Sequence, residues 1–317
     1  MAIEGVSAAS RAKFLDPNVT AKGEQRAKVA FTGLRTLWVN TGTLCTITCA
    51  HCYIESSPST DRLSYFTPAD FAPFLEEVDA LSGGPIEVGF TGGEPFLNPH
   101  MGTLAAMALT RGHSVLILTN AMRPMLRPKP ADAFRALREN HGARLNLRVS
   151  LDHYETDHHD QERGAGCFDE AVEGIDWLTA HGFLVSLAGR SMWGERETDA
   201  RLGYAKLIAE HGWSIDAHDP AQLVIFPEMD ETAEVPEITD ACWDLLNVAP
   251  SAMMCASARM IARRRGATAP AVMACTLLPY DPGFELGARL ADSLAPVSLN
   301  HRHCAKFCVL GGGSCSA

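Results

Sequence analysis

The sequence predicts an α/β fold with a parallel sheet, because short apolar runs alternate with longer segments of helical periodicity. Apolar residues make up 46% of the 317-residue chain, which is enough for a packed core. Strand–helix repeats of this kind normally place their helices on the faces of one parallel sheet. The expected strands are residues 34–39, 86–90, 114–119, 145–150, 183–188 and 223–226.

Residues that could bind a metal or a ligand lie at the ends of these strands. A loop with three cysteines follows the first strand, and a Gly-Gly-Glu-Pro segment at 92–95 follows the second. Asn120, Ser150 and Arg190 lie at or just beyond the ends of the next three strands. Ligands of parallel sheets bind at the carboxyl ends of the strands, so these segments are expected to meet at one edge.

The three cysteines of the first loop are Cys45, Cys49 and Cys52, with the spacing C-x3-C-x2-C. Three thiolates on a short loop can hold three irons of a 4Fe–4S cluster, whose usual protein ligand set is four cysteines. One iron would then keep an open position, which is where metal sites perform chemistry. The alternative is a zinc site that takes His51 or a remote cysteine as its fourth ligand.

The cysteine loop and the later Gly-Gly-Glu-Pro segment together resemble the radical SAM superfamily, in particular its SPASM/twitch and molybdenum-cofactor-cyclase-like branches. The resemblance runs through residues 34–230 and includes the segment 158–168, with its His-His-Asp, Arg-Gly and Gly-Cys-Phe groups. It implies a partial (β/α)6 TIM-like barrel. It also implies an enzyme that cleaves S-adenosylmethionine (SAM) at a 4Fe–4S cluster, so that a 5′-deoxyadenosyl radical abstracts hydrogen from substrate.

The resemblance also implies which residues contact SAM. Gly92, Gly93 and Glu94 are expected to orient SAM through its amino group, and glycines allow a close backbone approach. Ser150 is expected near the ribose and methionine parts of SAM. Arg190 is expected to bind the SAM carboxylate, because a guanidinium suits a bidentate contact.

One position of the cysteine loop departs from the family pattern. His51 stands before the third cysteine, where the superfamily usually has an aromatic ring that packs beside the adenine. An imidazole is planar but also polar, so the adjacent Tyr53 is expected to share this contact and is included among the cofactor-binding residues.

Cysteines are concentrated after residue 230, so we expect three parts: an N-terminal extension (1–33), a radical SAM core (34–230) and a cysteine-rich C-terminal subdomain (231–317). The tail resembles the auxiliary-cluster tails of SPASM and twitch enzymes, but the full seven-cysteine SPASM spacing is absent. One auxiliary iron–sulfur cluster is therefore expected, with a structural zinc as the alternative. The candidate ligands are Cys255, Cys275, Cys304 and Cys308, with Cys315 as a competing ligand.

Residues 251–266 have a helical pattern that ends in a basic run, Arg259 and Arg263 to Arg265. The favoured interpretation is a helix whose last turn carries cations that complement its dipole, with Gly266 as the cap. An anion site for a phosphate or carboxylate is the alternative.

Composition limits the classes of molecule that this chain is expected to bind. The net charge of −11 argues against a nucleic-acid surface, and no apolar run approaches the ~20 residues of a membrane span. Ten cysteines without an apolar signal segment indicate metal or redox work in a reducing cytoplasm rather than disulfides. An oxidoreductase-type reaction with a reducing partner such as flavodoxin or ferredoxin is expected.

The substrate is less determined than the cofactors. The compact length and the short cysteine set favour a small molecule, as in the molybdenum-cofactor cyclase or the twitch dehydrogenases. The tail cysteines and the segment 158–168 favour a peptide or protein, as in the SPASM maturases. A non-catalytic iron–sulfur or zinc protein is the distant alternative, and such a protein would not cleave SAM.

Overall fold

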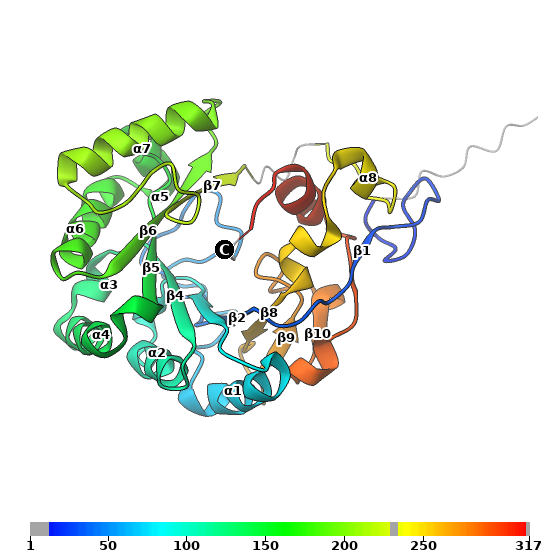
Figure 1. Ribbon diagram of the computed structural model, residues 1–317, viewed down its shortest axis with the longest axis horizontal. Helices are drawn as coiled ribbons and strands as arrows, with labels where there is room; N and C mark the ends of the chain where they lie inside the picture. The colour runs from blue at the N-terminus through cyan, green and yellow to red at the C-terminus, as the bar shows by residue number, and fades with distance from the viewer. Residues whose placement is uncertain (1–12, 229–233, 315–317) are drawn as a thin grey trace, which may run out of the picture.

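The computed structural model describes residues 13–228 and 234–314, and its centre is one nine-stranded sheet (Figure 1). The strand order is β10-β9-β8-β2-β3-β4-β5-β6-β7, and all neighbours from β8 to β7 are parallel. The six expected strands are present as β2 (Thr36–Asn40), β3 (Glu87–Thr91), β4 (Ser114–Thr119), β5 (Leu145–Ser150), β6 (Leu184–Ser191) and β7 (Leu223–Pro227).

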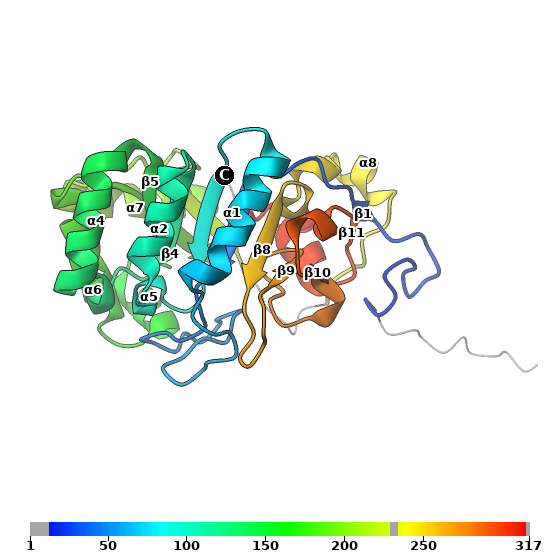
Figure 2. The same ribbon diagram turned by 90° about the horizontal axis from the view of Figure 1, so that it is seen from below.

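Helices cover the outer face of this curved sheet. Figure 2 shows α4, α2 and α1 side by side on that face, and apolar side chains between the helices and the sheet form the main core. The first helix begins with a capping box between Thr67 and Asp70 and ends at Gly83, which adopts the left-handed conformation. The helices are α1 (Pro68–Ser82), α2 (Met101–Thr110), α3 (Arg123–Leu126), α4 (Pro128–His141), α5 (Thr156–Arg163), α6 (Cys167–Ala180), α7 (Glu197–His211) and α8 (Cys242–Leu246).

The C-terminal part continues the same sheet. Strand β8 (Ala258–Ala262) lies parallel to β2, and β9 (Ala271–Met273) and β10 (Glu285–Gly287) follow in antiparallel order. The helix expected over 251–266 is therefore wrong. All five residues of β8 are buried, because the strand is covered on both faces, and such a strand lacks the alternation that separates it from a helix.

Residues before β2 pack against the C-terminal part. Strand β1 (Lys28–Val29) pairs with β11 (Val297–Ser298), and the buried Arg26 forms an ion pair with Glu237. The remaining short elements are the 3-10 helices η1 (Pro95–Leu97), η2 (Gly142–Arg144), η3 (Pro250–Ala252), η4 (Met254–Ala256), η5 (Pro282–Phe284) and η6 (Leu290–Ser293), and the π-helix η7 (Cys304–Leu310). In the described part of the chain, none of the helices is long and apolar enough to cross a membrane.

Candidate functional site

One cavity at the carboxyl edge of the sheet collects most of the predicted site residues. The cavity is lined by the cysteine loop and by residues at the ends of β3, β4, β5 and β6. Phe226 of β7 and Leu277 and Phe307 of the C-terminal part complete its wall. The predicted residues that line it are Cys45, Cys49, Cys52, Tyr53, Gly92, Gly93, Ser150 and Arg190.

The glycines after β3 hold the cysteine loop in place. The N–H of Gly93 donates to the carbonyl of Gly42 at 2.8 Å, and the N–H of Glu94 donates to the carbonyl of Leu44 at 2.9 Å. A Cβ on Gly93 would lie 2.1 Å from the Leu44 oxygen, and one on Gly92 would lie 2.4 Å from the Gly42 oxygen. The sequence pattern predicts glycine for the approach of a ligand, but the closest neighbour in the structure is the backbone of the cysteine loop.

Two thiols of this loop, those of Cys45 and Cys49, are largely shielded from water. Burial raises the pKa of Cys45 to about 11 and that of Cys49 to about 12, whereas the nearby guanidinium of Arg163 acts in the opposite direction. The N–H of Ser56 donates to the Cys52 sulfur at 3.4 Å. Thiolates in such a place need a cation, and a metal centre supplies one because a coordinated thiol is deprotonated.

Glu94 is not among the residues that line the cavity, and its expected contact with SAM stays a prediction. It is 2% exposed and accepts hydrogen bonds from the Phe96 N–H at 3.0 Å, the Thr119 hydroxyl at 2.8 Å and the Asn120 N–H at 2.9 Å. These bonds join the ends of β3 and β4. The two glycines of the motif line the cavity, whereas the Glu94 carboxylate is hydrogen-bonded within the protein.

Glu162, at the end of α5, is a site residue that the sequence prediction missed. It is 3% exposed, and its carboxylate accepts from the His51 N–H at 2.9 Å and lies 2.7 Å from the His51 Nδ1. The same carboxylate forms an ion pair with Arg190 at 2.6 Å, and the Glu162 carbonyl accepts from the Ala50 N–H. Glu162 therefore ties the cysteine loop to the arginine that is predicted to bind SAM.

A second buried ion pair lies beside it. Arg163 binds both carboxylate oxygens of Asp152, at 2.7 and 2.9 Å. Burial alone would raise the pKa of Asp152, but Arg163 outweighs this effect, so the pKa lies below its usual value. Both residues line the cavity, and the Arg-Gly pair in segment 158–168 is the sequence signal that could have identified them.

The predicted tail ligands share a second apolar cluster. Cys255, Cys275, Cys304 and Cys308 all pack in or against it. Burial raises the pKa of Cys255 to about 11 and that of Cys304 well above its usual value, and the thiols of Cys275 and Cys255 raise the pKa of Cys304 further. The thiols of Cys255, Cys275 and Cys304 are therefore close enough to influence one another's ionisation. Cys315 lies outside the described residues.

A buried arginine accompanies these cysteines. Arg259 is 1% exposed, and it donates to the carbonyls of Cys255 at 2.6 Å, Ala258 at 2.7 Å and Ser293 at 2.8 Å. Its Nη2 has no hydrogen-bond partner within the described residues. Burial lowers the pKa of Arg259 to about 10, and the thiols of Cys255 and Cys275 oppose this shift. Arg259, which was expected in the last turn of a helix, is therefore a buried strand residue beside the backbone of Cys255.

Comparison with known proteins places this architecture in a family. A sequence profile of the Radical SAM superfamily matches residues 39–207. The antilisterial bacteriocin subtilosin biosynthesis protein AlbA of Bacillus subtilis (strain 168) is 27% identical over 155 residues, which are 47% of this chain and 32% of AlbA. The chain thus matches about a third of that relative's length.

Solved structures share the fold. The structure of native anSMEcpe with bound AdoMet has a TM-score of 0.58 at 14% identity and covers 81% of this chain and 79% of its own. SuiB of Streptococcus suis bound to S-adenosylmethionine has a TM-score of 0.57 at 11% identity and covers 82% of this chain and 64% of SuiB. With the profile match over more than half of its length, the chain belongs to the radical SAM superfamily, whose members are enzymes that use a 4Fe–4S cluster and SAM.

Proposed function

We propose that this radical SAM enzyme acts on a peptide substrate and uses one auxiliary iron–sulfur cluster. The catalytic part of the proposal rests on one observation, that Cys45, Cys49 and Cys52 line one cavity with Gly93 and Arg190. When bound there, the 4Fe–4S cluster and SAM supply a 5′-deoxyadenosyl radical that removes a hydrogen atom from substrate.

The side chains around the cavity have separate tasks in this proposal. Arg190 and Ser150 bind the polar end of SAM, and Glu162 holds Arg190 in position. His51 and Tyr53 supply the flat surfaces beside the adenine. Apolar wall residues such as Phe226 and Phe307 exclude water from the radical, which prevents side reactions.

The tail cysteines fit an auxiliary cluster because of the buried guanidinium beside them. A charge as buried as that of Arg259 requires compensation by an opposite charge. Its hydrogen-bond acceptors are neutral carbonyls, and its ring contact is with Phe31 at 4.4 Å. A cluster held by four thiolates carries net negative charge and would provide that compensation. We propose Cys255, Cys275, Cys304 and Cys308 as its ligands, with Cys315 as the competing ligand.

A peptide substrate is supported by the relatives. AlbA is named for the biosynthesis of the bacteriocin subtilosin, and anSMEcpe has been solved with bound peptides. These names describe those proteins, and the chain matches only 32% of AlbA. The small-molecule substrate that the compact length favours is the competing proposal, and a flavodoxin or ferredoxin is the proposed electron donor in either case.

Two measurements test this function. Iron and sulfide are measured after anaerobic reconstitution of the wild type and of a Cys45/Cys49/Cys52→Ala variant. We expect the variant to lose half of the iron and all formation of 5′-deoxyadenosine. Equal iron in both proteins would contradict the assignment of the catalytic cluster, and complete loss would contradict the auxiliary cluster.

The substrate class requires a separate assay. The reduced holoenzyme is incubated with SAM and a synthetic peptide library of random sequence, or with the equivalent free amino acids. The proposal predicts that only the peptides raise 5′-deoxyadenosine formation and that some of them change mass. Stimulation by free amino acids alone would favour the small-molecule alternative.

A further inference from the structure

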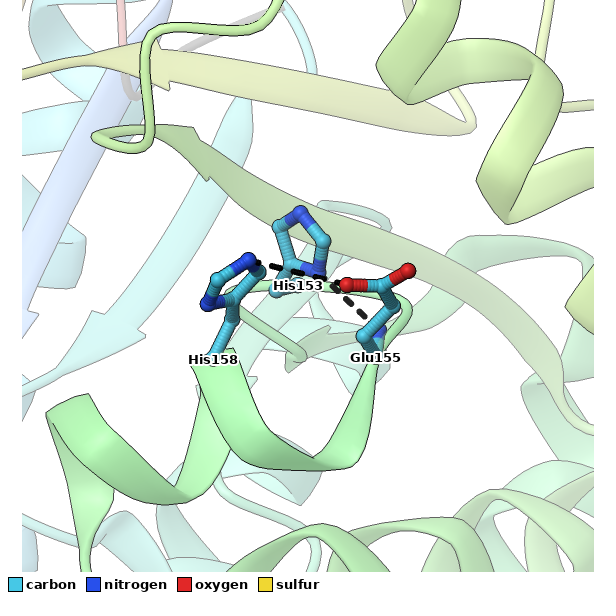
Figure 3. A group of neighbouring side chains, drawn as sticks. All are labelled: His153, Glu155 and His158. Atoms are coloured by element: carbon cyan, nitrogen blue, oxygen red, sulfur yellow. Dashed lines mark hydrogen bonds and ion pairs between the residues drawn. The ribbon is translucent and has the colours of Figure 1, made fainter.

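Two histidines and a glutamate outside both cysteine sites bring metal-ligating atoms close together. We propose that His153, Glu155 and His158 bind a divalent transition-metal ion of the zinc class. Their ligand atoms lie within 4.8 Å of one another, and Figure 3 shows the two imidazoles and the carboxylate facing a common point. The group lies at the loop after β5 and the first turn of α5. The proposed metal site is independent of the substrate and of the auxiliary cluster proposed above.

The hydrogen bonds of His153 place its lone pair on Nδ1, the atom that would bind the metal in exchange for its present hydrogen bond. Its Nε2 lies 2.9 Å from Glu195, and the Tyr154 hydroxyl donates to the same carboxylate at 3.1 Å. Its Nδ1 accepts the N–H of Glu155 at 3.0 Å, so Nδ1 carries the lone pair and Nε2 carries the proton. A carboxylate that holds the far nitrogen of a ligating histidine is the usual outer partner in zinc sites.

The two other ligands are placed to complete the site. The Nε2 of His158 lies 3.6 Å from Glu155, and its ring stacks on Trp193 at 5.1 Å. His153 is 2% exposed, whereas the side chains of His158 and Glu155 are 37% and 58% exposed, so an ion can enter from solvent. An ion bound to Nδ1 would replace the hydrogen bond from the Glu155 N–H and would face the positive end of α5. The carboxylates of Glu155 and Glu195 offset this repulsion.

The ligand types select the class of ion. Two imidazoles and one carboxylate suit zinc and its neighbours, whereas calcium and magnesium prefer oxygen ligands. Three protein ligands leave the fourth tetrahedral position to water. A bound ion would join the loop after β5 to α5, whose last residues are Glu162 and Arg163 of the SAM cavity. The site would therefore stabilise the helix that positions these two residues.

The test uses the holoprotein with its clusters loaded, so that the cysteines are already ligated. Zinc binding is measured by equilibrium dialysis with metal analysis, and zinc-edge X-ray absorption reports the ligands. We expect one zinc per chain with nitrogen and oxygen ligands at about 2.0–2.1 Å and no sulfur ligands at about 2.3 Å. Iron content should not change.

Three variants make the test specific. His158→Ala and Glu155→Gln should each weaken zinc binding at least tenfold, whereas His218→Ala, which removes an exposed histidine elsewhere, should not. Circular dichroism confirms that each variant is folded, and the exposed Glu155 serves as the second probe should His158→Ala fail to fold. Zinc with sulfur ligands, or equal affinity in the wild type and Glu155→Gln, would overturn the proposal.

Discussion

Replacing Gly93 with alanine tests whether the glycines serve the cysteine loop. The new Cβ would lie 2.1 Å from the Leu44 oxygen and 2.7 Å from the Thr43 oxygen, whereas ordinary contacts begin at 3.4 Å. Both neighbours are backbone atoms, so no side-chain rotation relieves the contact. The loop that begins at Cys45 must therefore move by about 1 Å.

The expected loss of stability follows from the hydrogen bonds that this loop movement would break. Two backbone hydrogen bonds join the loops, from Gly93 to Gly42 and from Glu94 to Leu44, and each contributes about 1 kcal/mol. Local stability should therefore fall by about 2 kcal/mol. A displacement of about 1 Å at a reacting centre can cost about 100-fold in rate, so 5′-deoxyadenosine formation should fall by about that factor.

The control is Gly84→Ala, because a Cβ at Gly84 meets no atom within 4 Å. Both variants are reconstituted anaerobically, and iron content, SAM affinity and 5′-deoxyadenosine formation are compared with the wild type. Gly84→Ala should match the wild type in all three. The reasoning is refuted if Gly93→Ala retains wild-type iron and turnover, or if both variants lose them equally.

Three further predictions concern charged residues. Glu162→Gln should weaken SAM binding about tenfold by calorimetry, because Arg190 loses its ion-pair partner; unchanged affinity would contradict this role. Arg259→Gln should lower the reduction potential of the auxiliary cluster by about 59 mV, which is a tenfold change in the equilibrium constant of a one-electron couple. In the same redox titration, the reduction potential of the catalytic cluster should not change. Burial lowers the pKa of His159 to about 4, so the unfolded chain binds more protons between pH 6.5 and 4. Stability to urea should fall as the pH drops through this window, and less so in His159→Gln.

The sequence predicted the parallel core well because local patterns determine it. Alternating apolar runs gave all six strands from β2 to β7, and cysteine spacing identified the loop that the structure places at their carboxyl edge. Strand β8 was missed because all five of its residues are buried, so helix and strand give similar patterns. Its place beside β2 depends on pairing between residues more than 200 positions apart.

Side-chain roles were harder to predict than the positions of loops. The Gly-Gly-Glu pattern identified a loop whose glycines line the cavity, but the Glu94 carboxylate accepts hydrogen bonds from neighbouring backbone amides. Glu162 lies 111 positions from His51, and a carboxylate in a polar helical segment carries no signal of such a partner. Both cases show that a motif indicates which backbone segments meet, whereas the tertiary structure decides where each charge points.

The C-terminal tail packs against the edge of the sheet beside the cavity that holds Cys45, Cys49 and Cys52. A partial barrel leaves β7 as an edge strand, and an uncovered edge exposes unpaired backbone groups. Here the ring of Phe307, on the π-helix η7, packs against Phe226 of β7 with 5.7 Å between centroids. Figure 1 shows the segment after η7 running into the inside of the curved sheet. Phe307 lines the cavity of the catalytic cysteines and is adjacent to Cys308, so a cluster bound by the tail would share a wall with the substrate.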